Sequence, residues 1–265
     1  MIAETRSLEE HLRAARIAGS VNTPRESNLD HARGFAAGDP AHQFGLPPRE
    51  PWSYERVVAL LAERVGIDPD LSRETGADTI DPARTVEALD RMRTRLARAA
   101  AARERVVLAT GHPTGIFDIH LAVASALRAA GATVLTPAAG VRFDVPTAYS
   151  EQRSQLQLHY LGGVAVGGDN FALRHSHSSV GMDLMLAALA EGGEAPPDLV
   201  IADHGFAGAA ARAGLDVVCF ADCNDPALVV GEAEGRIGVT VPLDDNVLPH
   251  LYRPLVDYLL ADWPA

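Results

Sequence analysis

Two short apolar runs in the second half of the chain constrain the fold most. Residues 199–202 and 217–221 have the length and the branched apolar side chains of strands buried on both faces, as in a parallel sheet. The alanine-rich residues 207–213 between them predict a crossover helix that ends at Gly214. This strand–helix–strand unit is typical of an α/β fold.

Polar side chains follow both apolar runs directly. The first run opens onto Asp203, His204 and Gly205, and the second opens onto residues 222–225, which read Asp-Cys-Asn-Asp. In open α/β sheets, ligands bind at the carboxyl ends of the strands. We therefore expect a site at this edge of the sheet, with residue types suited to metal binding or to acid–base chemistry.

The rest of the second half continues the same alternation of strands and helices. The pattern predicts strands at 106–109, 132–135, 164–166 and 239–241, an irregular pair at 141–143 and 156–160, and helices at 116–129, 180–189 and 247–260. The expected fold class is therefore α/β, with a Rossmann-like, mostly parallel sheet and helices on both of its faces. An N-terminal helical segment precedes this sheet.

The N-terminal segment shows helical periodicity in three places. Helices are predicted at 7–18, at 53–65 with Ser53 as the N-cap, and at 81–102. An alanine-rich junction at 99–102 is the natural boundary between two parts of the chain. We expect an N-terminal helical cover at 1–100 and an α/β catalytic domain at 101–265.

Residues 20–50 lack regular periodicity and predict a long loop. Such a loop either wraps the surface of the sheet or closes over the site. Arg25 within it is a candidate clamp for an anionic substrate, because a guanidinium can bind two oxygens at once. Asn28 is a second candidate substrate-binding residue in the same segment.

Composition excludes several kinds of chemistry. All 23 basic residues are arginine, so the chain has no lysine. This excludes four kinds of chemistry that need a lysine: Walker-type phosphate binding, Schiff-base chemistry, pyridoxal phosphate chemistry and the usual haloacid dehalogenase mechanism. No G-x-S-x-G motif is present, which excludes the α/β-hydrolase elbow. A net charge of −12 argues against a nucleic-acid partner. Cys219 and Cys223 read as reduced, buried thiols.

The chain also lacks the patterns of membrane and secreted proteins. It has no apolar run of the length that a membrane span needs, and its acidic N-terminus does not resemble a signal peptide. We therefore expect a cytoplasmic protein with no membrane partner, whose partner is a small phosphorylated substrate. A homodimer is a further expectation.

The predicted strand at 106–109 runs into a turn that reads T-G-H-P-T-G, and a helix follows. Free backbone N–H groups and the positive end of a helix dipole at this point suit a phosphate or carboxylate. Thr110, Gly111, Thr114 and Gly115 are therefore candidate substrate-binding residues. A tight strand-to-helix turn with capping threonines would have the same sequence.

A second cluster follows the apolar run 164–166. An H-x-H pair, His175 and His177, directs both imidazoles to one side of an extended chain, which is a common way to give a metal two ligands. Asp169 and Asn170 lie just upstream. The alternative is that the two histidines cap the helix that follows them.

Four successive strand ends thus carry polar clusters, and together they predict one site. The candidate metal ligands are Asp169, His175, His177, Asp222 and Asp225, for a divalent ion such as Mg²⁺, Mn²⁺ or Zn²⁺. His204 is the first candidate general acid or base, His112 is the second, and Asp203 would orient His204. Asn170 and Asn224 are further candidate substrate-binding residues. A metal-free site, with an anion held by the 110–115 turn, is the alternative.

Four motifs in the chain are similar to those of a known family. T-G-H-P-T-G, H-S-H-S-S-V-G-M-D, I-A-D-H-G-F-A-G-A-A and F-A-D-C-N-D-P-A-L resemble a family of actinobacterial phosphatases over about residues 106–245. The resemblance implies hydrolysis of phosphate esters. A fainter similarity is to the D-glutamate cyclase-like family, whose first strand also ends in T-G and which has a G-M pair like Gly181-Met182. The D-G-G-N-E run of that family is absent from this chain.

Three functions follow from these residues. The leading hypothesis is a phosphoric monoester hydrolase that uses a divalent metal to hydrolyse a small phosphorylated metabolite. The second is a lyase or cyclase that acts on a small hydroxy or amino carboxylic acid, with His204 as the base and Arg25 as the carboxylate clamp. The third is a non-catalytic protein that binds an anionic ligand.

Overall fold

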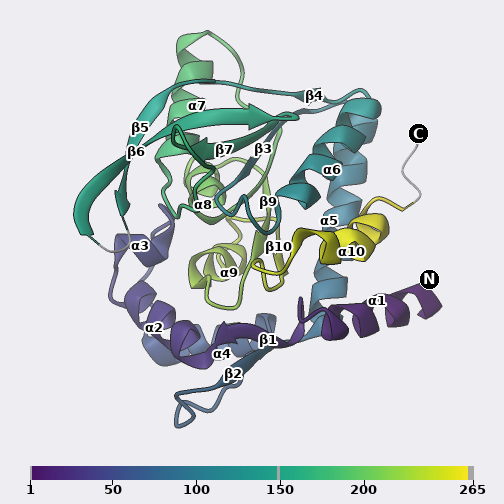
Figure 1. Cartoon of the computed structure of the whole chain (residues 1–265), viewed down its shortest axis with the longest axis vertical. Coiled ribbons are helices and arrows are strands. Elements are labelled where there is room, and N and C mark those ends of the chain that lie inside the picture. The colour runs from purple at the N-terminus through teal and green to yellow at the C-terminus, as the bar shows by residue number, and fades with distance from the viewer. Residues whose placement is uncertain (1, 148–149, 262–265) are drawn as a thin grey trace.

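A computed structural model describes residues 2–147 and 150–261 of the chain (Figure 1). Within these residues, eight strands form one mixed sheet and two more form a separate two-stranded sheet. The sheet strands are β3 (Arg105–Thr110), β4 (Thr133–Val134), β5 (Arg142–Thr147), β6 (Ser150–Leu161), β7 (Val164–Gly168), β8 (Leu199–Asp203), β9 (Val217–Ala221) and β10 (Val239–Pro242). The strands of the two-stranded sheet are β1 (Gly19–Pro24) and β2 (Ala77–Ile80).

The sheet has the order β10-β9-β8-β3-β7-β6-β5, and β4 pairs with the start of β3. Strands β10, β9, β8, β3 and β7 are parallel, whereas β6 and β5 continue the sheet in antiparallel pairs. The Rossmann-like, mostly parallel sheet is therefore confirmed. In the sheet, β3 lies between β7 and β8, so the strand order changes direction at β3. In α/β proteins, ligands bind beside such a change of direction, at the carboxyl ends of the strands.

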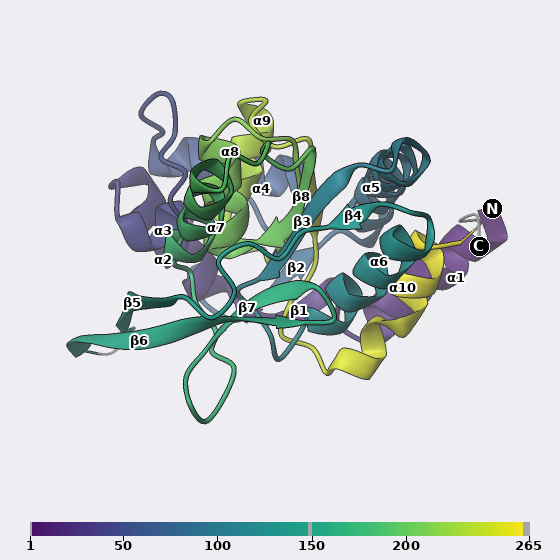
Figure 2. The same cartoon turned by 90° about the horizontal axis from the view of Figure 1, so that it is seen from above.

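Helices cover both faces of the sheet, as expected (Figure 2). Helices α7 (Val180–Glu191), α8 (His204–Arg212) and α9 (Pro226–Ala233) lie on one face; α5 (Pro82–Ala102), α6 (Phe117–Ala129) and α10 (Arg253–Leu259) lie on the other. A short 3-10 turn, η1 (Pro249–Tyr252), precedes α10. Pro254 lies in the first turn of α10, where proline is tolerated, but it would break a single helix that ran through both segments. No helix in the described part of the chain is long and apolar enough to cross a membrane.

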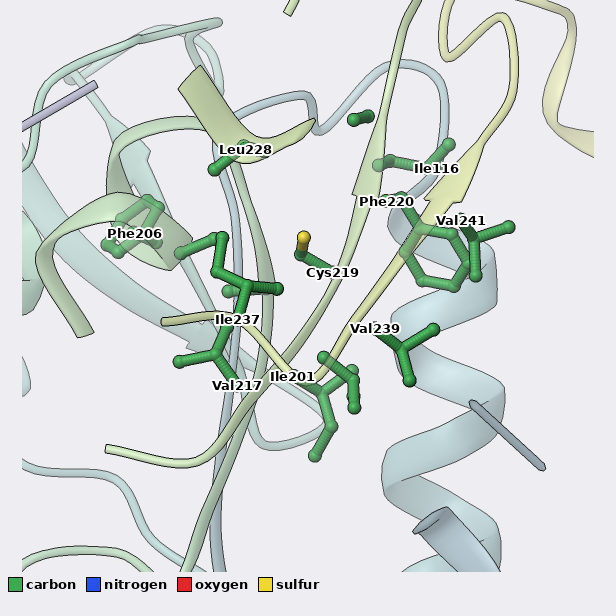
Figure 3. Close-up of a cluster of buried hydrophobic side chains, with 14 of the residues drawn as sticks. Ile116, Ile201, Phe206, Val217, Cys219, Phe220, Leu228, Ile237, Val239 and Val241 are labelled. Carbon is green, nitrogen blue, oxygen red and sulfur yellow. The ribbon is translucent and has the colours of Figure 1, made fainter. Parts of the chain in front are cut away.

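The parallel strands bury apolar side chains on both faces. Figure 3 shows Phe220, Val239 and Val241 on the side of the sheet next to the helix that follows Ile116, while Phe206 and Leu228 from α8 and α9 pack on the other side. Removing a side chain of this size from water contributes about 1.5–3 kcal/mol. These buried strands hold the residues at their carboxyl ends in fixed positions.

The N-terminal part comprises α1 (Ile2–Ala14), α2 (Arg25–Ala36), α3 (Pro40–Gln43) and α4 (Tyr54–Arg64), followed by α5. Its side chains belong to the same hydrophobic core as the sheet, and α5 packs directly against β10. Ser53 caps α4 as expected, since its hydroxyl accepts the N–H of Arg56 at 3.2 Å. A domain boundary near residue 100 stays a prediction.

The prediction of a loop at 20–50 was wrong. Strand β1 pairs antiparallel with β2, more than fifty residues away, and α2 and α3 follow it. Helix α2 was not predicted from the sequence because its buried face includes Arg25 and Asn28 beside Leu29 and Phe35. Those two polar side chains interrupt the apolar pattern by which an amphipathic helix is found.

The pair expected at 141–143 and 156–160 is the antiparallel ladder of β5 and β6, in which Phe143 lies opposite Leu156 and the register shifts between Pro146 and Thr147. Two other elements differ in detail. Helix α1 spans Ile2–Ala14, so it begins and ends earlier than the helix predicted at 7–18. Helix α8 begins at His204, three residues before the predicted start. This early start places His204 at the junction of strand and helix with a left-handed φ of 44°.

Candidate active site

Residues from the carboxyl ends of β3, β8, β9 and β10 meet at one edge of the sheet. His204 Nε2 lies 3.7 Å from Asp225 Oδ2 and 3.5 Å from Asp245 Oδ2. The segment after β7 adds His175 and His177, whose ring centroids lie 5.1 and 4.8 Å from that of His204. The structure therefore brings together side chains from strand ends that are distant in sequence.

Asp203 and His204 form the centre of this site. Asp203 Oδ1 accepts a hydrogen bond from His204 Nδ1 at 2.8 Å and another from the N–H of Gly111 at 2.6 Å. Because Nδ1 of His204 is committed to Asp203, only Nε2 faces the other carboxylates. An aspartate that fixes the tautomer of a histidine in this way is typical of histidines that bind metals.

The charges of this pair stabilise each other. Burial would lower the pKa of His204, but Asp225, Asp203 and Asp245 outweigh it and raise the pKa to about 10. Burial would raise the pKa of Asp203, but the hydrogen bond and charge of His204 lower it to about 2. His204 is therefore cationic when no metal is bound, and a metal ion at Nε2 would have to displace its proton.

Three histidines form the first group of donors, which we call the histidine set: His175, His177 and His204. One ligand atom from each lies within 4.8 Å of the others. Burial, followed by the charge of His204, lowers the pKa of His175 to about 3 and that of His177 to about 2, although His175 is an exposed residue. Both rings are therefore neutral near pH 7, which is the form that binds a metal.

Three aspartates form the second group, which we call the carboxylate set: Asp222, Asp244 and Asp245. Their ligand atoms also lie within 4.8 Å of one another, and a third group of His204, Asp225 and Asp245 links the two sets. Burial and neighbouring aspartates raise the pKa of Asp222 to about 7 and that of Asp245 well above its usual range. The carboxylates of this set are therefore buried close enough to repel one another, and His204 offsets only part of that repulsion at Asp245.

The imidazole nitrogens and carboxylate oxygens of these groups are suitable ligands for a divalent ion. Among the described residues, no arginine forms an ion pair with Asp203, Asp222, Asp225, Asp244 or Asp245. His112, only 5% exposed, carries an Nδ1 atom with no hydrogen-bond partner. Its Nε2 lies 3.8 Å from Asp245 Oδ1, and burial followed by the charge of His204 lowers its pKa to about 4.

The 110–115 turn differs from the expected anion-binding loop. The N–H of Gly111 donates to Asp203, that of His112 to the hydroxyl of Thr110, and that of Gly115 to the carbonyl of His112. These three amides are therefore committed within the protein, and the Thr114 side chain is exposed. The turn instead holds His112 and Asp203 in place.

The glycines of this turn are required by close approach of the backbone. A Cβ atom at Gly111 would collide with the carbonyl oxygen of Ser176, and the N–H of Ser176 donates to the carbonyl of Gly111 at 2.9 Å. A Cβ atom at Gly115 would collide with the carbonyl of Asp245 and lie 2.8 Å from His112 Nδ1. The two glycines thus bring the histidine loop and Asp245 against β3.

Gly115→Ala should therefore damage both the site and the fold. We expect the free energy of unfolding to fall by about 1–3 kcal/mol, as for other overpacked positions, because the backbone at Asp245 must move. Urea unfolding followed by circular dichroism measures this loss. Ser125→Ala, on the exposed side of α6, should change it by less than about 0.5 kcal/mol. An equally small change for Gly115→Ala would contradict the proposed contact.

The N-terminal segment is bound to the same edge of the sheet. The Thr23 hydroxyl donates to Asp222 Oδ2 at 2.5 Å, and the N–H of Asn22 donates to Asp244 Oδ2 at 3.0 Å. His31 Nδ1 donates to the carbonyl of Asn224 at 2.6 Å. This segment therefore orients two members of the carboxylate set.

Several predicted site residues have other partners. Arg25 is fully buried, and its guanidinium pairs with Asp78 at 2.9 Å and donates to two backbone carbonyls, so it cannot clamp a substrate. Asn28 donates to Asp78 and accepts from the Cys223 thiol, which matches the buried, reduced state expected for Cys223. The side-chain amide of Asn224 donates to the Ser27 hydroxyl.

Asp169 and Asn170 belong to a turn beside the site. Asp169 accepts hydrogen bonds from the backbone of Phe171 and Ala172 and from Arg174 Nε at 2.7 Å. Both of its oxygens are thus occupied, and it is in none of the three donor groups. Asn170 is exposed.

Sequence reasoning missed other residues of the site. Asp244 and Asp245 follow β10 directly, and the same rule of acidic residues at a strand end would have found them. His31 and His42, with ring centroids 4.6 Å apart, come from the segment that was expected to be a loop. His120 lies beneath Asp203, with Nε2 3.6 Å from Asp203 Oδ2 and both atoms without a hydrogen-bond partner. Its position within an apolar helix gave no signal.

The fold and the site define a class of protein: an α/β protein with imidazoles and carboxylates gathered at the carboxyl edge of a parallel sheet. The chain belongs to the Phosphatase family, whose sequence model matches residues 3–263. It is 45% identical to Phosphatase SCO2771 of Streptomyces coelicolor over 257 aligned residues. These residues cover 96% of this chain and 94% of that protein. No solved structure matches the chain. The resemblance to actinobacterial phosphatases is confirmed.

Proposed function

We propose that this phosphatase is a phosphoric monoester hydrolase that uses divalent metal to cleave a small phosphorylated metabolite. The observation that carries the proposal is the meeting of imidazoles and buried carboxylates at one point, with no arginine paired to those carboxylates among the described residues. A phosphate ester is an anion. Within this site, bound cations would supply the positive charge that attracts it.

The residues that would hold metal are those of the histidine set, the carboxylate set and Asp225. Divalent ions bound there would acidify a water molecule and neutralise charge on the phosphoryl group. His204 suits the role of ligand better than that of free base, because Asp203 occupies Nδ1 and two carboxylates face Nε2. Asp203 then keeps the His204 ring in the required orientation.

His112 is the residue that we propose for proton transfer. Its ring centroid lies 4.5 Å from that of His175 at the exposed end of the site, and its Nε2 faces Asp245 Oδ1. In hydrolysis of R–O–PO₃²⁻, the water oxygen bonds to phosphorus while the ester P–O bond breaks, which yields an alcohol and phosphate. His112 is neutral near pH 7 and would accept a proton from the attacking water at Nδ1, which has no hydrogen-bond partner, and pass that proton to the departing alkoxide oxygen.

The experiment compares chelator-treated protein with the same protein after addition of Mg²⁺, Mn²⁺ or Zn²⁺. Substrates are sugar, nucleotide and amino-acid phosphates, with a phosphodiester as the control. We expect metal-dependent release of inorganic phosphate from monoesters and none from the diester. Absence of release from every monoester with every metal would refute the proposal, as would equal release with and without chelator.

The burial of Arg25 removes the support for the lyase or cyclase hypothesis. That hypothesis needed the guanidinium as a carboxylate clamp, and the guanidinium is enclosed with Asp78 in the N-terminal part. The donor groups at the sheet edge remain available to phosphate chemistry. Monoester hydrolysis is therefore the function that these residues support best.

A further inference from the structure

We propose that the site holds two divalent ions of different chemical class: a zinc-like ion on the histidine set and a harder ion, such as Mn²⁺ or Mg²⁺, on the carboxylate set. This inference rests on the metal-assisted function proposed above and makes it specific. It assigns two adjacent positions where the sequence predicted a single mixed group of ligands.

The histidine set offers nitrogen donors only. His175 and His177 come from the segment after β7, and His204 comes from the start of α8. Asp203 holds the His204 ring through Nδ1 at 2.8 Å, so that Nε2 is the atom presented to an ion. Three imidazoles favour zinc and neighbouring transition metals over magnesium or calcium.

The carboxylate set offers oxygen donors only. Asp222 and Asp244 are held by Thr23 and by the N–H of Asn22. Asp245 differs, because its side chain is only 7% exposed and it faces two histidine nitrogens, His204 Nε2 at 3.5 Å and His112 Nε2 at 3.8 Å, without a hydrogen bond to either. A cation bound at Asp245 would compensate this buried carboxylate more closely than those rings do, and oxygen ligands favour hard cations.

The two sets lie side by side. His204 Nε2, from the first set, is 3.5 Å from Asp245 Oδ2, from the second, and Asp225 lies against the same nitrogen at 3.7 Å. The carboxyl groups of Asp222, Asp225, Asp244 and Asp245 carry four negative charges when ionised, which two divalent ions would balance. Ions at adjacent positions can contact the same phosphoryl group, as in two-metal phosphatases.

The test measures metal content and not activity. Full-length protein is stripped with chelator, dialysed against equal limiting concentrations of Zn²⁺ and Mn²⁺, and analysed for both metals, and bound Mn²⁺ is also followed by electron paramagnetic resonance. We expect one zinc and one manganese per chain. A single ion in total, or the two metals distributed equally over both positions, would overturn the inference.

Two variants assign the positions. His175→Ala, at the exposed end of the histidine set, should weaken zinc binding by about 10-fold or more and leave manganese bound, whereas Asp244→Asn should do the reverse. Asp257→Asn on the exposed face of α10 is the matched control and should keep both metals. Circular dichroism and thermal unfolding confirm that each variant is folded; if Asp244→Asn is not, Asp222→Asn takes its place. Loss of both metals together in both folded ligand variants would contradict two separate positions.

The outcome separates this inference from the proposed function. If phosphate is released with a single bound ion, monoester hydrolysis stands and the two-ion site is refuted. If both ions bind as expected and no monoester is cleaved, the two-ion site stands and the hydrolytic function is refuted.

Discussion

Replacing His204 with asparagine is expected to lower kcat/KM for phosphate release by at least about 10³-fold, because several kcal/mol of metal-dependent stabilisation are lost together. His204 belongs both to the histidine set and to the group that links it to the carboxylate set. Asparagine is the suitable replacement because it tolerates the left-handed φ of 44° at this position, which alanine would strain. The fold should therefore survive while the site fails.

The measurement is steady-state release of inorganic phosphate, with bound metal determined on the same preparation. His250→Asn is the matched control, because His250 is exposed in η1 and lies in none of the donor groups. It should retain activity within about twofold. Activity of His204→Asn within tenfold of the unaltered protein would show that this histidine neither binds the metal nor orients the substrate.

Replacing Asp78 with asparagine is expected to lower the free energy of unfolding by about 3–5 kcal/mol. Asp78 and Arg25 are both fully buried, and their ion pair is 2.9 Å long. Asn28 and the N–H groups of Asp68 and Thr79 also donate to Asp78. The neutral amide would leave the Arg25 charge buried without compensation, and an amide NH₂ group would face donors instead of accepting from them.

Urea unfolding followed by circular dichroism gives the change in stability. The control is Asp30→Asn, which removes the exposed Arg33–Asp30 pair, in which the Asp30 side chain is 71% exposed, and should cost less than about 1 kcal/mol. Equal losses for the two variants would mean that burial of the Arg25–Asp78 pair does not matter. The segment that carries Arg25 also carries Thr23 and His31, so the result bears on the site as well.

The strands and the edge that carries the site could be predicted because each leaves a local signal. Residues 199–202 and 217–221 read as strands because both of their faces are buried, so almost every side chain is apolar. Asp203, His204, Asp222 and Asp225 then follow from the rule that sites form at the carboxyl ends of parallel strands. The H-x-H spacing of His175 and His177 is also local, and the structure places both rings beside His204.

What could not be predicted depends on partners distant in the sequence. Arg25 was predicted to bind an anion because no residue near it in the sequence indicates that Asp78 is its partner. Because Arg25 is a buried polar residue of α2, it also interrupts the apolar pattern that would have predicted this helix. The 110–115 turn has the composition of an anion-binding loop, but Asp203, 92 residues further on, accepts the N–H of Gly111. Local patterns give the type of a residue and its position on an element, and only the packed structure shows which atoms are already bonded.

The hydrogen bonds from Asn22 and Thr23 to Asp244 and Asp222 join residues that are 222 and 199 positions apart. Closing so large a loop costs conformational entropy, and contacts of such long range form late in folding. This edge of the sheet is therefore complete only once segments near the beginning and near the end of the polypeptide have met. Any ligand that binds only the finished edge shifts the equilibrium of the entire chain toward the native state by mass action.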